Sequence, residues 1–398
     1  MKLGALPGIR GVRSRLRRWF FQFLRHIAAI EDTREIFAGM LYEQNAIPVP
    51  AELSRFADLK APYADLPRAV PKPARDNNMP GPVFITGRFR SGSTMLWNLF
   101  RHLPNVTSYY EPLNEARWFD PARRARRVDP THIGVSDYWG EYEGLEELGQ
   151  YFDEDWKFRH LYMPAYAWNP KLKQYIELLV ARARGRAVLQ FNAVDFRLPW
   201  LRATFPNARI IHLFRHPRDQ WCSTLRNSTR AMQMCRLRDF ESLDKFYLLS
   251  WARDLRHYFP FLTLDEDAYA YELYYQVWRL SHLFGQMYAD LSVAFEDLIT
   301  NPRSVIRAIL NAAAMADVDV EMLVPLITQV SPGKWREHGD AAWFTDLETR
   351  VDRILSAYVD GISNTITRAS PWALANSCVA HNMTTRSLDA AHQEGLGD

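Results

Sequence analysis

The stretch of sequence best suited to chemistry lies between residues 87 and 94, Gly-Arg-Phe-Arg-Ser-Gly-Ser-Thr. Its two glycines, Gly87 and Gly92, allow the backbone conformations of a tight loop whose amide groups can turn toward one ligand. Ser93 and Thr94 stand at the expected start of a helix, where free N–H groups and the helix dipole favour an anion. The stretch therefore predicts a phosphate-binding loop.

The charge of this loop comes from an arginine. A nucleoside triphosphatase loop, G-x-x-x-x-G-K-[ST], has lysine where this chain has Ser93, and here the fixed charge is Arg90, three residues earlier. A Gly/Ser-rich turn that binds nothing is the alternative interpretation. The segment from Arg90 to Thr94 resembles the 5′-phosphosulfate loop of sulfotransferases, which transfer a sulfuryl group from 3′-phosphoadenosine-5′-phosphosulfate (PAPS) to an acceptor. It departs from many soluble members in having Arg90 for lysine, which keeps the charge, and Phe89 for a small residue or proline. The resemblance implies that these loop residues bind the donor: Arg88, Phe89, Arg90, Ser91, Gly92, Ser93 and Thr94.

The carboxylate of Glu111 follows an expected strand over residues 106–110. Open α/β sheets gather active-site groups at the carboxyl ends of their strands. Sulfuryl transfer to an alcohol needs a base for the hydroxyl proton, and desolvation can raise the pKa of a carboxylate toward that task. The Tyr-Glu-Pro-Leu segment is similar to one in carbohydrate sulfotransferases, and tyrosylprotein sulfotransferases also place a glutamate after the corresponding strand. We therefore predict that Glu111 is the general base and that Arg90 neutralises charge on the departing 5′-phosphate. Glu115 is the second candidate, and a surface or helix-capping role for Glu111 is the alternative.

A second basic motif, Arg-His-Pro-Arg-Asp-Gln-Trp-Cys-Ser, begins at Arg215 and ends at Ser223. It follows an expected strand over residues 209–214, and Pro217 and Asp219 favour the first turn of a helix. A guanidinium and a hydroxyl at one crevice can hold a terminal phosphate. The block resembles the 3′-phosphate-binding segment of sulfotransferases, which has the same spacing between its arginine and its serine. A structural salt bridge between Arg215 and Asp219 is the alternative.

Gly333, Lys334 and Trp335 resemble the Gly-x-Trp element with which sulfotransferases close over adenosine 3′,5′-bisphosphate. The resemblance implies that Lys334 offers charge and Trp335 a stacking face, whereas a plain surface loop is the alternative. Sulfuryl transfer by these residues requires no metal. Three aspartates follow expected strands, but the sequence gives none of them a metal-holding partner.

Alternating strand and helix patterns predict how these motifs are positioned. Short apolar runs rich in branched and aromatic residues indicate strands at residues 83–86, 106–110, 187–192, 209–214 and 291–295, with helical spacing between them. The pattern predicts an α/β protein, and the resemblance implies a P-loop-containing nucleotide-binding fold with a central, mainly parallel sheet flanked by helices. We expect a basic amphipathic helix and Pro-rich lead-in at residues 1–80, a sulfotransferase domain at 81–375, and a polar tail at 376–398. Around residues 118–180 we expect a helical insertion, either a solvated acidic helix pair or a lid whose exposed aromatic residues form an acceptor wall.

Composition narrows the classes of partner. The 398 residues are 47% hydrophobic and 13% aromatic, which is enough for a large core, and a net charge of +3 does not indicate a nucleic-acid partner. Three cysteines without metal-ligand spacing favour a reducing compartment, so we expect a cytoplasmic protein. No stretch is apolar enough for a transmembrane helix. The basic amphipathic segment at residues 10–30 indicates a peripheral membrane contact, a targeting peptide or packing against the domain.

The resemblance of the two basic motifs to those of sulfotransferases implies an enzyme that uses PAPS as its donor co-substrate. The acceptor is a hydroxyl compound, and carbohydrate, lipid, peptide tyrosine and small alcohol all fit, with carbohydrate favoured by the Glu-Pro-Leu likeness alone. The first rival is a P-loop kinase using ATP, which would need a loop lysine and a metal-holding acid. The second rival is a non-enzymatic membrane-surface protein built around the N-terminal segment.

Overall fold

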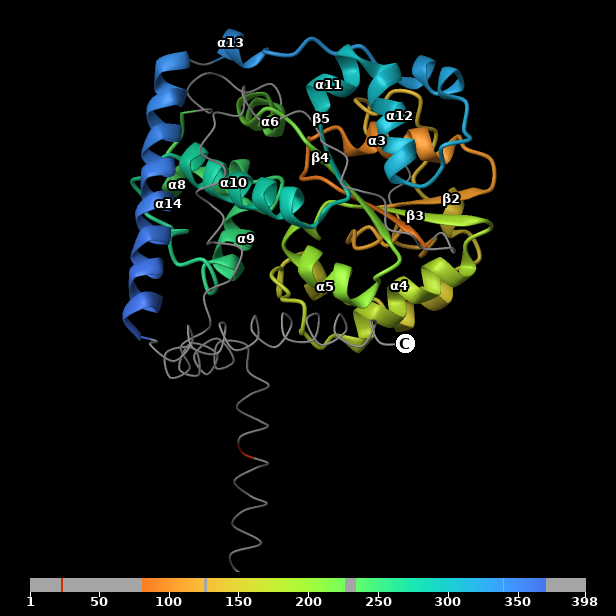
Figure 1. Cartoon of the computed structure of the whole chain (residues 1–398), viewed down its shortest axis with the longest axis horizontal. Coiled ribbons are helices and arrows are strands. Elements are labelled where there is room, and N and C mark those ends of the chain that lie inside the picture. The colour runs from red at the N-terminus through yellow and green to blue at the C-terminus, as the bar shows by residue number, and fades with distance from the viewer. Residues whose placement is uncertain (1–22, 24–80, 125–126, 226–233, 339, 370–398) are drawn as a thin grey trace, which may run out of the picture. The chain divides into compact units, whose positions relative to one another are not determined.

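The structure, a computed structural model, describes residues 23, 81–124, 127–225, 234–338 and 340–369 (Figure 1). Two compact units divide the chain between Val49 and Pro50, and every element below belongs to the second unit. The expected N-terminal helix and Pro-rich lead-in, residue 23 apart, and the polar tail lie outside the described residues.

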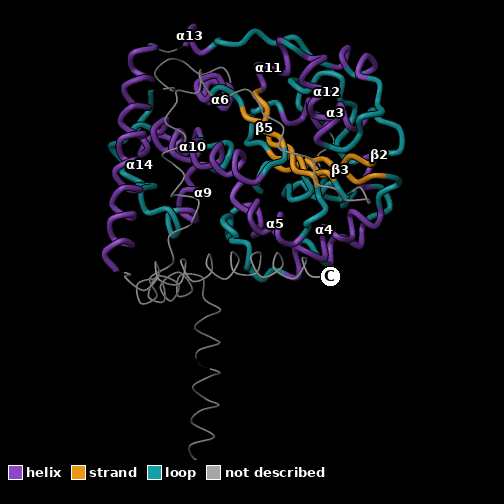
Figure 2. Tube along the Cα trace, viewed as in Figure 1, coloured by secondary structure: helices purple, strands orange, loops and turns teal. Residues whose placement is uncertain are grey.

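A five-stranded, wholly parallel sheet runs through the centre of the described part of the chain (Figure 2). Its strands are β1 (Val83–Thr86), β2 (Val106–Tyr110), β3 (Arg186–Phe191), β4 (Arg209–Phe214) and β5 (Leu291–Ala294). The spatial order of the strands is β2-β3-β1-β4-β5, with β1 at the centre. The chain places β2 and β3 on one side of β1 and then β4 and β5 on the other side, so the order in which strands are added reverses beside β1. The predicted parallel α/β fold is confirmed, and ligands in such sheets bind outside the carboxyl ends of the strands at this reversal.

Helices cover both faces of the sheet, because neighbouring residues on a strand point to opposite sides. Val83 and Ile85 of β1 belong to a core shared with α3 (Ser93–Arg101), α11 (Phe295–Thr300) and α12 (Pro302–Ala312). Phe84, between them, belongs to the opposite core, which includes α4 (Pro170–Arg182), α5 (Leu198–Thr204), α9 (Leu248–Leu255) and α10 (Ala270–Tyr288). The remaining helices used below are α6 (Pro217–Thr224), α13 (Trp335–His338) and α14 (Ala341–Ala369).

The segment at residues 118–180 differs from its expected structure. Instead of an acidic helix pair it contains three short 3-10 turns, η3 (Gly140–Tyr142), η4 (Glu146–Gln150) and η5 (Glu154–Lys157), before α4 begins. Of its aromatic side chains, Tyr138, Tyr142 and Trp156 are buried in the core, whereas Tyr166 and Trp168 are exposed. The expectation of a solvated helix pair is wrong, because the segment forms short turns around buried rings instead of helices with a solvated face.

The loop after β1 has the backbone conformation that its glycines predict. Gly92 has a φ of +93°, in the left-handed region, and directly precedes α3. Its carbonyl oxygen accepts from the backbone N–H groups of Met95 and Leu96 at 3.0 and 3.3 Å. A Cβ atom at this position would collide with the ring of Phe295. Both the backbone angle and the close approach therefore require glycine.

We expect Gly92→Ala to lower the free energy of unfolding by about 1–2 kcal/mol more than Gly144→Ala does. Both glycines have positive φ, but a Cβ at Gly144 would meet nothing within 4 Å, so the control loses only the backbone preference. The difference is the cost of forcing a methyl group against Phe295. Urea unfolding of the two variants measures it, and equal losses would show that the ring moves aside freely.

Candidate active site

The carboxyl ends of the strands open onto a cavity of about 810 Å³. Because β3, β1 and β4 are neighbours, the segments that follow them meet at one edge of the sheet. Residues after β2 reach the same edge. The cavity is lined by nine of the residues expected to bind donor or acceptor: Phe89, Arg90, Gly92, Ser93, Thr94, Glu111, Arg215, Ser223 and Lys334.

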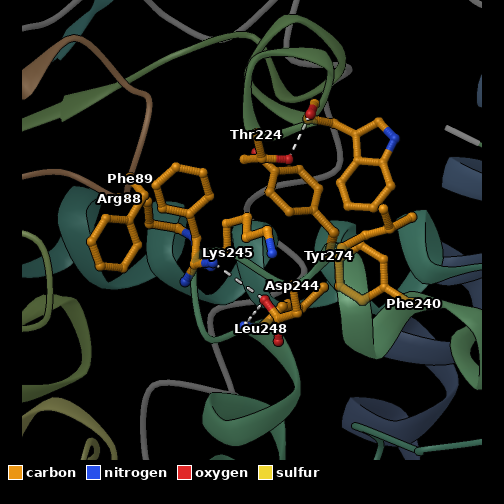
Figure 3. A pocket seen from close by; sticks show the side chains of 11 residues that line it. Arg88, Phe89, Thr224, Phe240, Asp244, Lys245, Leu248 and Tyr274 are labelled. Carbon is orange, nitrogen blue, oxygen red and sulfur yellow. Dashed lines mark hydrogen bonds between the residues drawn. The ribbon is translucent and has the colours of Figure 1, made fainter. Parts of the chain in front are cut away.

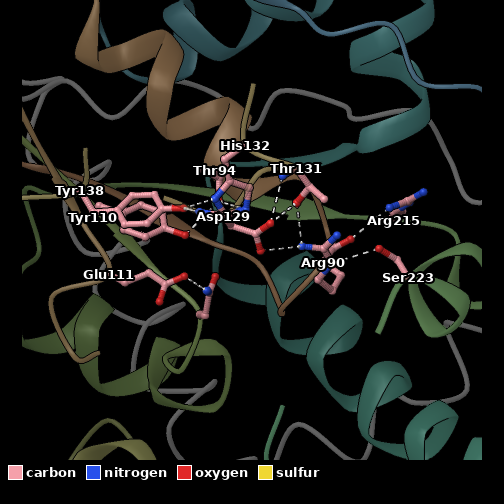
Figure 4. Close-up of polar contacts among 11 residues, drawn as sticks. Arg90, Thr94, Tyr110, Glu111, Asp129, Thr131, His132, Tyr138, Arg215 and Ser223 are labelled. Carbon is pink, nitrogen blue, oxygen red and sulfur yellow. Dashed lines mark hydrogen bonds and ion pairs between the residues drawn. The ribbon is translucent and has the colours of Figure 1, made fainter. Parts of the chain in front are cut away.

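Arg90 stands where the two basic motifs meet (Figure 4). Its Nε donates to Ser223 Oγ at 3.0 Å. Its Nη1 donates to Thr131 Oγ1 at 3.3 Å and lies 3.8 Å from Asp129 Oδ2. Nη1 of Arg215 donates to the backbone oxygen of Arg90 at 3.3 Å. The two motifs, 125 residues apart in the chain at these positions, therefore face the same cavity.

The second motif is held by residues from both faces of the sheet, Phe295 from the α3 face and Trp278 from the opposite one. The Arg215 guanidinium lies 5.0 Å from the ring centre of Phe295, and its backbone oxygen accepts from Trp278 Nε1 at 3.1 Å. The alternative interpretation pairs Arg215 with Asp219 in a structural salt bridge. Asp219 instead accepts from the backbone N–H groups of Gly333 and Trp335 at 2.7 and 3.0 Å. The carboxylate thus holds the loop that carries Lys334 next to the cavity.

Glu111 lies at the end of β2 with only 8% of its surface exposed. Its φ of +39° is unusual for a residue with a side chain, and such strain is concentrated at functional sites. Oε1 accepts from Asn192 Nδ2, and Oε2 accepts from Asn114 Nδ2. Burial raises the pKa of Glu111, although the charge of Lys157 and the hydrogen bond from Asn114 oppose that shift. The result is a fixed carboxylate that can accept a proton more readily than an exposed one.

Glu115, the second candidate base, is engaged elsewhere. It pairs with Lys157 Nζ at 2.5 Å and accepts from the hydroxyl of Tyr247. Burial alone would raise the pKa of Glu115, but Lys157 and Tyr247 outweigh it and lower that pKa. A carboxylate stabilised in its charged form is a weaker base, so of the two carboxylates Glu115 is the weaker base.

Lys157 is a cavity residue that motif analysis missed. It ends the turn η5, is 3% exposed, and its Nζ lies 5.3 Å from the ring centre of Phe89 and 5.1 Å from that of Tyr247. It brings positive charge to the Glu111 side of the cavity. The sequence surrounds it with acids and aromatic residues in an irregular segment, and no spacing there indicates a ligand.

Among the residues that the structure describes, no group of three or more His, Cys, Asp or Glu side chains is arranged to hold a metal ion. The same residues include no helix both long and apolar enough to cross a membrane.

Residues 82–319 match the family model described as the sulfotransferase family. The chain belongs to that family. Similar solved structures include a sulfotransferase from Alicyclobacillus acidocaldarius, with 19% identity and a TM-score of 0.33 over 72% of this chain and 96% of that one. A sulfotransferase from Mycobacterium avium has 15% identity and a TM-score of 0.38 over 72% and 78% of the two chains. The sulfotransferase domain of the Synechococcus PCC 7002 olefin synthase has 18% identity and a TM-score of 0.31 over 72% and 98%. A search of curated proteins finds no match.

Two of the expected loop residues of this sulfotransferase lie behind the cavity instead of in it. Arg88 is buried, and its guanidinium lies 5.0 Å from the ring centre of Trp251. With Phe89 and Tyr274 it lines a separate, smaller cavity of about 20 Å³ (Figure 3). Ser91 is completely buried. Neither side chain lines the large cavity, although both residues belong to the loop.

Trp335 is also placed differently from its expected role. Only 5% of it is exposed, its ring stacks on His216 with centres 6.0 Å apart, and the Arg218 guanidinium lies 4.6 Å from its centre. Phe344 of α14 packs on it edge-on, at 5.7 Å. The indole therefore gives the sulfotransferase cavity no stacking face, and its packing instead anchors the loop next to Lys334.

We expect Asp219→Asn to weaken binding of adenosine 3′,5′-bisphosphate about three- to tenfold. The amide would turn its N–H₂ toward one of two backbone donors, so the loop that carries Lys334 would lose a charged hydrogen bond. Isothermal titration calorimetry measures the affinity, with Asp346→Asn on the exposed face of α14 as the matched control. Equal affinity in the two variants would mean that this loop takes no part in binding.

Proposed function

We propose that this sulfotransferase uses PAPS as its donor and transfers the sulfuryl group to the hydroxyl of an acceptor, with a carbohydrate as the favoured class. The observation that carries the proposal is the contact between the two basic motifs. Arg90 Nε lies 3.0 Å from Ser223 Oγ, and Arg215 Nη1 lies 3.3 Å from the Arg90 backbone oxygen. One ligand with an anion at each end can therefore reach both motifs.

The residues present suit such a ligand. At one end, Gly92 leaves the loop without a side chain beside Phe295, and Ser93 and Thr94 begin an α-helix whose N-terminus favours an anion. At the other end, Arg215, Ser223 and Lys334 offer charge and a hydroxyl to a second anion. A ribose with phosphates at both its 3′ and 5′ positions has this distribution of charge.

The proposed mechanism assigns a task to each group. The donor supplies the activated sulfuryl group. Glu111 takes the proton of the acceptor hydroxyl while the acceptor oxygen forms its bond to sulfur. Arg90 and the loop amides stabilise the electron pair that the departing 5′-phosphate receives as its own bond to sulfur breaks. Arg215 and Ser223 hold the 3′-phosphate and so keep the reacting atoms in register.

Calorimetry with two nucleotides tests the donor. Adenosine 3′,5′-bisphosphate is expected to bind at least about tenfold more tightly than adenosine 5′-phosphate, because only the former offers the charged hydrogen bonds of a 3′-phosphate. Equal affinities would refute the assignment of the second motif. Transfer of label from ³⁵S-PAPS to fractionated carbohydrate, lipid and small-alcohol acceptors then identifies the acceptor.

Further assays on the same protein distinguish the proposed function from its two alternatives. A P-loop kinase would turn over ATP in the presence of Mg²⁺ and would show no preference for a 3′-phosphorylated nucleotide. A non-enzymatic membrane-surface protein would float with liposomes and bind no nucleotide; the segment expected to do so, residue 23 apart, lies outside the described residues.

A further inference from the structure

Asn192, immediately after β3, is the one amide in this region that touches both the phosphate loop and the candidate base among the described contacts. Its Oδ1 accepts from Ser93 Oγ at 3.1 Å and from Gln190 Nε2 at 2.8 Å. Its Nδ2 donates to Glu111 Oε1. Asn192 is 7% exposed and lines the large cavity.

The direction of the amide follows from its partners. A carboxylate can only accept hydrogen bonds, so the N–H₂ end of Asn192 must face Glu111. The carbonyl end then receives two donors, Ser93 and Gln190, which leaves the side chain a single orientation. A chain of two hydrogen bonds therefore runs from the Ser93 hydroxyl through Asn192 to the Glu111 carboxylate, and hydrogen bonds in such chains polarise one another.

We propose that Asn192 is a positioning residue that orients the Glu111 carboxylate and connects it to the phosphate loop through Ser93. The inference rests on the proposed function, in which Glu111 is the base. β3 lies between β2 and β1 in the sheet, so a residue at its end is the shortest route between the strand that carries the base and the loop that follows β1. Without the amide, Glu111 would keep its hydrogen bonds with Asn114 and Tyr110 but would have no connection to the loop through Asn192.

The pKa of Glu111 is the quantity to measure, because a purely structural role of Asn192 would leave that pKa unchanged. A hydrogen bond donated to the carboxylate stabilises its ionised form, so removal of Asn192 Nδ2 should raise the pKa of Glu111 by about one unit. The other groups that influence Glu111 stay in place in this experiment: Lys157, Glu115, Asn114, Tyr110, Tyr142 and Tyr247.

The experiment follows the ¹³Cδ signal of Glu111 with pH in the full chain, with the signal assigned by its loss in Glu111→Gln. We expect the pKa to rise by about one unit in Asn192→Ala and in Asn192→Leu, which keeps the approximate shape. It should rise further in Asn192→Asp, which puts a second carboxylate against the first. Asn98→Ala removes a cavity amide that makes no contact with Glu111 and should leave the titration unchanged. Unchanged titration in all three Asn192 variants would overturn the proposal.

Ser93→Ala tests the connection to the loop and serves also if the Asn192 variants fail to fold. It removes one donor to Asn192 Oδ1 but leaves Nδ2 in place, so we expect a smaller rise in the pKa of Glu111. No change would overturn the connection. Binding of adenosine 3′,5′-bisphosphate is measured in parallel, because failure of the wild-type protein to bind it would refute the proposed function while the titration still decides the role of Asn192.

Discussion

Glu111→Gln is expected to lower kcat for sulfuryl transfer by about 10²- to 10⁴-fold, the usual contribution of a positioned general base. Glutamine has nearly the same shape but cannot take a proton, and its single amide oxygen can accept from only one of the two donors, Asn192 Nδ2 and Asn114 Nδ2. Affinity for adenosine 3′,5′-bisphosphate should change little, since Glu111 lies on the acceptor side of the scheme. Single-turnover assays with ³⁵S-PAPS and an acceptor from the screen measure the first quantity, and calorimetry measures the second.

The matched control is Glu115→Gln, four residues along the chain. Glu115 lines the same cavity but is paired with Lys157 and accepts from Tyr247, so its replacement should disturb acceptor binding far more than the chemical step. If Glu115→Gln were the variant that lost kcat and Glu111→Gln were active, the base would be Glu115.

The pH profile gives a second readout of the same assignment. A base must be ionised to accept a proton, and burial raises the pKa of Glu111. The acid limb of kcat/KM should therefore lie above the ordinary glutamate pKa of about 4.3, with activity falling about tenfold per pH unit below that limb. The limb should be absent in the residual activity of Glu111→Gln.

Sequence analysis could place the parts of this site that lie on regular elements. The strand at residues 83–86 and the helix that begins at Ser93 follow from local apolar patterns, and Gly92 marks the turn between them. Arg90 and Arg215 come from short motifs directly after strands, and parallel strands deliver such motifs to one edge of the sheet.

The parts that sequence analysis could not place depend on packing between residues that are far apart in the sequence. Nothing near Trp335 shows that Phe344 of α14 and His216 enclose its ring, so a motif that predicts stacking on a ligand does not reveal which way the indole faces. Lys157 reaches the cavity from an irregular segment whose fold is set by buried aromatic side chains. The position of Asn192 is predictable from the sequence, because a polar residue directly after a buried strand lies at the same edge of the sheet as Glu111.

Arg215→Ala is expected to weaken binding of adenosine 3′,5′-bisphosphate by about 1.5–3 kcal/mol, the scale of a hydrogen bond between charged groups. Binding of adenosine 5′-phosphate should be almost unaffected, because the nucleotide lacks the 3′-phosphate that Arg215 is proposed to hold. The contrast between the two ligands separates loss of one contact from general damage, which would weaken both. Because Arg215 also donates to the Arg90 backbone oxygen, some loosening of the phosphate loop should appear as a small loss for both nucleotides.

Arg209→Ala provides the matched control for Arg215→Ala. Arg209 begins β4, whereas Arg215 follows its end, so the two arginines lie at opposite edges of the sheet. Only the carboxyl edge opens onto the cavity, and Arg209 is not among the residues that line it. Removing a positive charge from the far edge should leave the affinity for adenosine 3′,5′-bisphosphate close to that of the wild type at physiological salt, where charges more than about 8 Å apart are largely screened. Equal losses in both variants would attribute the effect to net charge and not to a site for the 3′-phosphate.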